Sequence, residues 1–192
     1  LETARPLTSE PIQRADIDRF LGLIEMTRGV PADACQLLLR AATDVAPVDA
    51  ERALQLLNIA GLAAAYAGDL KAAAEIGDVT RGLAVEQTPF ARMLVDLLVG
   101  LGAHAERDFA EAAPTLRAAL ELAEELDGDA GENPVALLFA GRAAIYLGDD
   151  QATYRTHRQA AAQARASGAL SIVTQILPRL ALADVWAGRW PS

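Results

Sequence analysis

The sequence predicts an all-α protein built from repeated helix–turn–helix units. The 192-residue chain is 52% hydrophobic but only 5% aromatic, so alanine supplies much of its apolar content. Alanine-rich chains with few β-branched residues favour helices. A short pattern also recurs along the chain at near-constant spacing, which is typical of repeat architectures. Glycine and proline occur where helices of such a repeat would end and begin.

The repeat is clearest in residues 58–69 and 138–149, which share an Ala-Gly pair, an Ala-Ala pair, a Tyr and a final Gly-Asp in register. Residues 19–30 and 97–108 match this pattern partly, and residues 179–190 match it one position out of step. The starts at 19, 58, 97, 138 and 179 are separated by 39, 39, 41 and 41 residues. We therefore expect about four and a half repeats of 39–41 residues each.

Within each repeat, a first helix is followed by a tight turn and a second helix. The first helices are expected to end near Gly29, Gly68 and Gly148, because glycine suits the left-handed conformation that terminates a helix. The second helices are expected over residues 32–44, 70–84, 109–126 and 150–167.

Helix starts are marked by Thr88-Pro89 and Asn133-Pro134, each a capping residue followed by proline at the first helical position. Pro114 and Pro178 fall inside expected helices, where a kink or a late start is predicted.

Two segments are expected to be irregular. Residues 1–14 have the composition of an N-terminal linker, which leaves residues 15–192 as one helical repeat domain. Residues 127–133 hold three carboxylates, but Leu138 stands where a calcium loop needs a bidentate Glu. We therefore interpret residues 127–133 as a solvated loop.

The repeat resembles the tetratricopeptide family. The third copy carries the family's small residue, turn Asp, aromatic residue and following Ala, bulky apolar residue and Ala at Gly100, Asp108, Phe109, Ala112, Leu116 and Ala119. The resemblance implies an α-α superhelix, a solenoid whose groove binds proteins or peptides. The period of 39–41 exceeds the family's usual 34, so we expect an irregular superhelix.

Alanine-rich, arginine-biased repeats of about 40 residues also look like the middle region of large ATP-binding LuxR-type (MalT-like) bacterial transcription regulators. Those proteins carry an N-terminal P-loop ATPase and a C-terminal helix-turn-helix. The resemblance implies that this chain is a fragment of a longer cytoplasmic protein and acts as its sensor or coupling region. A generic tetratricopeptide scaffold outside transcription is the alternative.

Charge and motifs argue against several other functions. The net charge of −9 disfavours direct nucleic-acid binding, which needs a basic surface, and no apolar run approaches a membrane span. The sequence has no Walker A motif and no Gly-x-Ser-x-Gly. His104, His157 and Cys35 are too scattered for a zinc set. Cys35 has the pattern of a buried apolar residue, and His157 that of a core or surface residue on a second helix. We therefore expect no catalytic residues, no metal and no cofactor.

Projecting the helical period from the repeat's glycine predicts which residues line the concave groove. The apolar row includes aromatic and arginine residues, which are typical binding anchors. The candidate binding residues are Asn58, Tyr66, Leu101, His104, Arg142, Tyr146, Arg179 and Trp186.

Alternatives to groove residues remain open for this row. A phase error of one residue would move its apolar members into the core, the arginines suit surface salt bridges, and Tyr66 and Tyr146 suit structural packing. The expected partner is a protein, a peptide or a small-molecule inducer, with a homodimer as a further expectation. An unrecognised hydrolase or transferase is the least favoured hypothesis.

Overall fold

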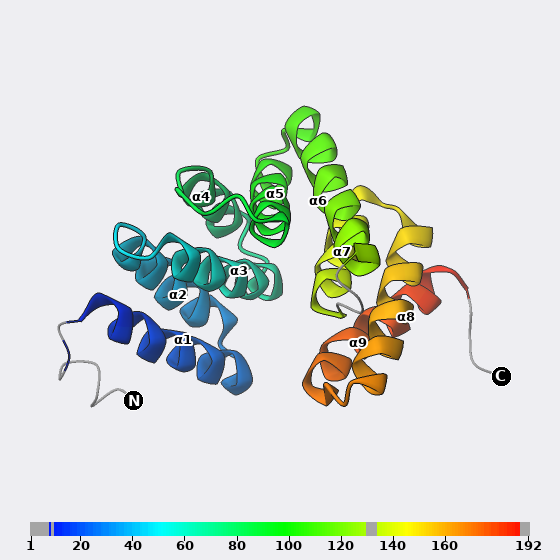
Figure 1. Ribbon diagram of the computed structural model, residues 1–192, viewed down its shortest axis with the longest axis horizontal. Helices are drawn as coiled ribbons and strands as arrows, with labels where there is room; N and C mark the ends of the chain where they lie inside the picture. Colours follow the sequence, from blue (N-terminus) through cyan, green and yellow to red (C-terminus); the bar gives the residue numbers. More distant parts are fainter. Residues whose placement is uncertain (1–7, 9, 130–133, 189–192) are drawn as a thin grey trace. The chain divides into compact units, whose positions relative to one another are not determined.

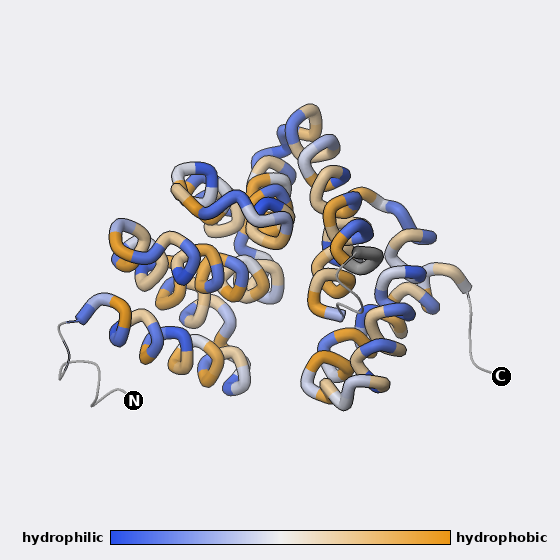
Figure 2. Tube along the Cα trace, in the orientation of Figure 1, coloured by the Kyte–Doolittle hydropathy of each residue, from blue (hydrophilic) through white to orange (hydrophobic). Residues whose placement is uncertain are grey.

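The computed structural model describes residue 8, residues 10–129 and residues 134–188, and side chains within these ranges except those of 127–129. It divides into two compact units, Leu1–Ala112 and Ala113–Ser192. The single repeat domain expected from the sequence stays a prediction, and each unit is described by itself. Figure 1 shows the helices of each unit and Figure 2 shows that apolar segments recur in every helix.

The described residues form helices joined by short turns, with no strand among them, which confirms the all-α prediction. The helices are α1 (Pro11–Arg28), α2 (Pro31–Val45), α3 (Ala50–Ala67), α4 (Leu70–Arg81), α5 (Pro89–Ala105), α6 (Phe109–Asp129), α7 (Pro134–Leu147), α8 (Asp150–Ala166) and α9 (Leu170–Trp186).

Side-chain caps explain why many of these helices begin where they do. The carboxylates of Asp49, Asp69 and Asp149 accept hydrogen bonds of 2.8–2.9 Å from the backbone N–H groups three residues on. Thr88 caps α5 in the same way at 3.2 Å, with Pro89 at the first helical position as predicted. Each cap satisfies a backbone donor that the first helical turn leaves unpaired.

A left-handed residue follows each odd-numbered helix at the same position of the repeat. These residues are Gly29, Gly68, Arg107, Gly148 and Gly188, with φ between 65° and 83°. Counted from starts at 19, 58, 97 and 138, the first four lie at position +10. Gly188 takes position +10 only if the fifth repeat starts at 178, which is why residues 179–190 matched the sequence pattern one position out of step.

The structure corrects several expected boundaries. The helix α1 begins at Pro11, so residues 11–14 are helical rather than linker, because Pro11 occupies the first turn, where no N–H is needed. Residues 1–7 and 9 lie outside the described residues. The helix α6 runs through Asp129, which makes 127–129 helical rather than loop, and residues 130–133 lie outside the described part.

The prolines within helices do not delay the helix starts. Pro114 lies inside α6, which already begins at Phe109, and Pro178 lies inside α9, which begins at Leu170. The helix α4 is shorter than expected and ends at Arg81 rather than at residue 84.

Each unit has its own apolar core. In the first unit, Leu38, Leu57, Ile76 and Leu98 are at most 1% exposed. In the second unit, a cluster from α7, α8 and α9 holds the core together, formed by Leu137, Leu138, Ala160, Ala161 and Ile176.

Glycines let neighbouring helices approach closely at two kinds of contact. At position +3 of α1, a Cβ on Gly22 would lie 2.6 Å from Cγ of Leu38 in α2. Between α4 and α5, a Cβ on Gly77 would lie 2.9 Å from the Cα of Gly102. At Gly22, the Leu38 side chain packs directly against the helix backbone. At Gly77 and Gly102, the backbones of two helices are in contact.

Candidate protein-binding surface

The structure does not bring the predicted groove residues together as one described site. Asn58, Tyr66, Leu101 and His104 belong to the first unit, whereas Arg142, Tyr146, Arg179 and Trp186 belong to the second. Their role in binding therefore stays a prediction.

Two members of the row are buried rather than groove-lining. Leu101 is 8% exposed and Arg142 is 5% exposed. Both lie at position +4 of the first helix of their repeat. In α1, Leu23 occupies the same position and is 39% exposed. Leu101 is therefore a core residue, and Arg142 is not an exposed salt-bridge residue.

The two most exposed members are aromatic. Tyr66 is 63% exposed and Trp186 is 54% exposed, so Tyr66 does not have the packing role considered as its alternative. Asn58, His104, Tyr146 and Arg179 are partly buried. The ring of His104 makes an edge-to-face contact with Phe109, with ring centroids 5.4 Å apart.

An apolar stripe on α1 was missed by the sequence projection. Phe20, Leu23 and Ile24 are 53%, 39% and 41% exposed, and their spacing places them on one side of the helix. The opposite side of α1 is buried through Ala15, Asp18 and Gly22. The i, i+3, i+4 spacing of the three residues was a visible signal, but it also fits a core face.

The α1 stripe (Phe20, Leu23 and Ile24) is exposed, whereas the equivalent positions of α5 are covered. In α5, the equivalent of Phe20 is Leu98, which is 1% exposed, and the equivalent of Ile24 is Gly102. Gly102 lies against α4 through Gly77, so these positions face the preceding second helix. The same face of α1 has no described helix covering it.

Charged side chains border the α1 stripe. The guanidinium of Arg19 lies 6.0 Å from the centroid of the Phe20 ring, within cation–π range. Asp16 forms an ion pair with Arg52 of α3, and Arg28 pairs with Glu25 at 2.8 Å. An apolar centre with a charged rim is the usual composition of a protein-binding patch.

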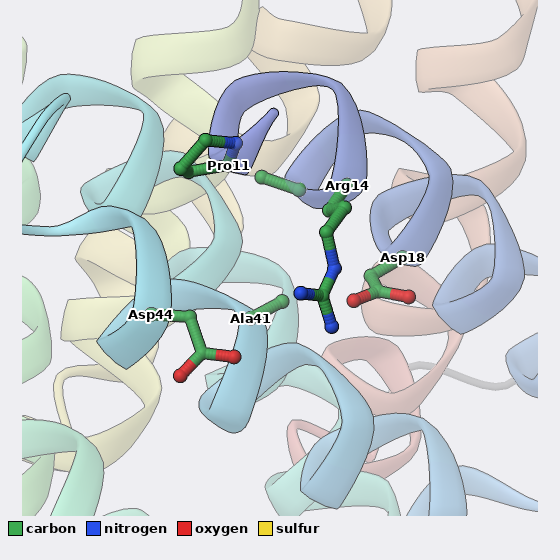
Figure 3. A pocket seen from close by; sticks show the side chains of 6 residues that line it. Pro11, Arg14, Asp18, Ala41 and Asp44 are labelled. Atoms are coloured by element: carbon green, nitrogen blue, oxygen red, sulfur yellow. The ribbon is translucent and has the colours of Figure 1, made fainter. Parts of the chain in front are cut away.

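A polar pocket of about 290 Å³ lies between α1 and α2, on the side of α1 opposite the stripe. Figure 3 shows the Arg14 side chain extending between the carboxyl groups of Asp18 and Asp44, with Pro11 and Ala41 completing the wall. Asp18 is 3% exposed, whereas Arg14 and Asp44 are exposed. The pocket therefore presents charged groups on a different side of α1 from the stripe.

A second, wider pocket of about 600 Å³ lies in the second unit between α6 and the start of α8. Arg155 of α8 donates a 2.6 Å hydrogen bond to Glu124 of α6 across this pocket. Both side chains are about half exposed, so the pair contributes little to stability. Glu121 also lines this pocket and is exposed.

Within the described ranges, no three or more His, Cys, Asp or Glu side chains are grouped to hold a metal ion. No helix of the described chain is both long and apolar enough to cross a membrane. Cys35 is 1% exposed, and burial, reinforced by the nearby Asp69 and Glu75 carboxylates, raises its pKa to about 11. Cys35 is therefore the core residue that the sequence predicted.

His157 is fully buried in the second unit and sits on Gly141. A Cβ on Gly141 would lie 2.5 Å from Nδ1 of His157, so only glycine leaves room for the imidazole. Nδ1 donates a 2.8 Å hydrogen bond to the Thr153 carbonyl, which makes Nε2 the unprotonated nitrogen. Nε2 is buried and has no hydrogen-bond partner among the described residues.

Acid should weaken the second unit through His157. Burial lowers the pKa of His157 below its ordinary 6.5, the Thr153 hydrogen bond opposes this shift, and the Arg179 charge adds to it. The unfolded chain then binds more protons below pH 6.5, so stability falls as pH drops through that value. We expect urea unfolding followed by circular dichroism to show a larger loss between pH 7.5 and 5.5 for wild type than for His157→Leu.

Leucine is a suitable control because α2 carries Leu38 at the same repeat position. An equal pH dependence in wild type and His157→Leu would show that other groups cause the acid sensitivity.

No protein-family model matches the sequence, and comparison with curated proteins finds no match.

Proposed function

We propose that this chain is a non-catalytic helical repeat module that binds a protein partner. The observation that carries the proposal is the α1 stripe, which leaves three large apolar side chains exposed on one helix face. Contiguous exposed apolar surface with a charged rim marks protein-interaction sites. The recurring helix pairs supply a rigid support for it.

A tetratricopeptide-like superhelix is the architecture that we propose for the full repeat array. Its support is the left-handed residue at position +10 of all five repeats, with the fifth counted from residue 178. Further support comes from the +3 glycine, which receives a bulky side chain of the second helix at Gly22 and at Gly141.

The biological context that we propose is the sensor or coupling region of a cytoplasmic bacterial transcription regulator. This step rests on the sequence resemblance to the middle region of LuxR-type regulators. Sequencing the parent gene tests it directly. An ATPase motif upstream and a helix-turn-helix downstream would support this context. A gene that lacks both would exclude it and favour the alternative, a generic tetratricopeptide scaffold outside transcription.

Binding through the α1 stripe is testable with helical peptides selected on the wild-type chain from a displayed library. The double variant Phe20→Ser, Ile24→Ser should lose binding about 100-fold, because such apolar anchors contribute about 2 kcal/mol or more. Thermal unfolding should stay near that of wild type, because both side chains are about half exposed in the folded state.

The matched control is Leu70→Ser, which removes an apolar residue of similar exposure, 61%, from the start of α4. Peptides that bind the double variant as tightly as Leu70→Ser would exclude the α1 stripe as the binding surface.

A further inference from the structure

The pocket between α1 and α2 lies where the first repeat departs from the pattern of the others. Counted from the same repeat starts, position −4 holds Leu54 in α3 and Met93 in α5, which are 3% and 1% exposed. In α1 this position holds Ala15, which lines the pocket. A large buried side chain is thus replaced by a methyl group, which leaves part of the space of about 290 Å³ open.

The wall of the pocket also carries a carboxylate where other repeats have leucine. Position −1 holds Leu57 in α3 and Leu137 in α7, which are at most 2% exposed, whereas α1 holds Asp18, which is 3% exposed. The third repeat has Asp96 at this position, but there Met93 fills position −4. Replacing a buried charged group by a well-packed apolar residue is often neutral or stabilising. The choice of Asp18 over leucine therefore indicates a role other than packing.

Two exposed side chains of opposite charge complete the pocket. The guanidinium of Arg14 extends between the carboxyl groups of Asp18 and Asp44 (Figure 3). Arg14 and Asp44 are exposed, and exposed side chains change rotamer within nanoseconds. The apolar part of the wall is formed by Pro11, Ala15 and Ala41. The pocket therefore offers two negative groups, one positive group that is able to reorient, and an apolar surface.

The volume of the pocket sets the size of a ligand. A water-sized group takes about 30 Å³, so about ten non-hydrogen atoms fill a space of about 290 Å³. Pockets for larger organic ligands begin at about this volume. A small aliphatic α-amino acid has this size, and it carries one ammonium group, one carboxylate and one apolar side chain.

We propose that this pocket binds a small aliphatic α-amino acid. The ammonium group lies between the carboxylates of Asp18 and Asp44 and displaces the guanidinium from that place. Arg14 turns to the carboxylate of the ligand, and the aliphatic side chain packs on Ala15 and Ala41. Each charge of the ligand then meets an opposite charge, which gives strong, directional hydrogen bonds. The pocket and the α1 stripe lie on different sides of α1, so the two binding proposals are tested separately.

Isothermal titration calorimetry of the full chain with L-leucine, L-isoleucine and L-valine tests the proposal. Two analogues of L-leucine separate its charges: isoamylamine lacks the carboxylate, and isocaproate lacks the ammonium group. We expect L-leucine to bind at least about ten-fold more tightly than isoamylamine, because isoamylamine makes no hydrogen bond with Arg14. Isocaproate should not bind, because it brings a negative charge to two carboxylates. In NMR spectra, the methyl signals of Ala15 and Ala41 should shift on binding, which locates the ligand.

Two substitutions that restore the repeat pattern should abolish binding and keep the fold. Ala15→Leu fills the pocket with the residue that α3 carries as Leu54, and Asp18→Leu introduces the residue that α3 carries as Leu57. Both variants should unfold in urea at or above the concentration that unfolds wild type, because each gains buried apolar surface. Loss of binding in a stable chain then assigns the loss to the pocket.

Charge substitutions test the role of each group. Asp18→Asn keeps the shape of the side chain and should weaken L-leucine binding at least about ten-fold. Arg14→Gln should weaken L-leucine binding and leave isoamylamine binding unchanged. The matched control is Asp33→Asn, which removes an exposed carboxylate at the other end of α2 and should leave binding at the wild-type level.

Three results would overturn the proposal. The first is the absence of binding by all three amino acids at millimolar concentration. The second is binding that survives Ala15→Leu or Asp18→Asn, which would place the ligand elsewhere. The third is isoamylamine that binds as tightly as L-leucine, with no effect of Arg14→Gln on either, which would make the pocket a site for amines.

Discussion

Leu38→Ala should be among the most destabilising single substitutions in the first unit. Leu38 is fully buried, and its side chain fills the space above Gly22, which has no side chain of its own to move into a cavity. Burial of this kind makes Leu→Ala cost about 2–5 kcal/mol, with the larger values where the site cannot collapse. We expect the upper half of that range, measured by urea unfolding with hydrogen exchange of α1 and α2 as the local readout.

A double-mutant cycle with Gly22→Ala makes the prediction sharper. In the wild-type background, the new Cβ would lie 2.6–2.8 Å from three carbons of Leu38, and such overpacking costs about 1–3 kcal/mol. A helix-propensity gain of about 1 kcal/mol offsets part of that cost. In the Leu38→Ala background the clash is gone, so the same substitution should become stabilising.

The change of sign is the informative result, because it isolates the contact between the two residues from their separate effects. If Gly22→Ala changes stability equally in both backgrounds, the packing of Leu38 on Gly22 does not stabilise the first unit.

The sequence was sufficient to predict the helices and their order. Caps such as Asp69 and Thr88 act locally on the next three residues, and the left-handed glycines end helices by their own backbone freedom. Such signals require no knowledge of the neighbouring helices, which is why the repeat predicted the four second helices to within a few residues.

The groove was not predictable to the same degree, because exposure depends on what the next helix covers. Position +4 illustrates this: Leu23 is exposed in α1, whereas Leu101 and Arg142 are buried in α5 and α7. The helical period places these residues on one face, but it does not state which face a neighbour occupies. The α1 stripe was missed for the same reason.

Gly77 shows the same limit within the core. It lies at position +19, where the other second helices carry Leu38, Leu116 and His157, so the repeat pattern alone favours a large residue at this position. The structure explains the glycine through the partner that it meets. Gly102 of α5 lies opposite, and the two backbones approach too closely for any side chain between them.

Gly77→Leu, the change that would restore the repeat pattern, should therefore destabilise the first unit strongly. A Cβ at Gly77 would lie 2.9 Å from Gly102 Cα and 3.4 Å from the Leu98 carbonyl oxygen, both backbone atoms that cannot rotate away. Alanine alone should cost about 1–3 kcal/mol, more than the helix-propensity gain of about 1 kcal/mol. Leucine adds three further carbons to a contact without space, so we expect α4 to separate from α5.

Hydrogen exchange resolved to α4 and α5, together with urea unfolding, measures this effect. The control is Gly82→Ala at the end of the same helix, where the nearest atom to a new Cβ is 3.5 Å away and φ is −83°. Gly82→Ala should be neutral or slightly stabilising, because alanine lowers the conformational entropy of the unfolded chain and meets no clash in the folded state. A Gly77→Leu chain as stable as Gly82→Ala would mean that α4 and α5 do not pack backbone to backbone at Gly77 and Gly102.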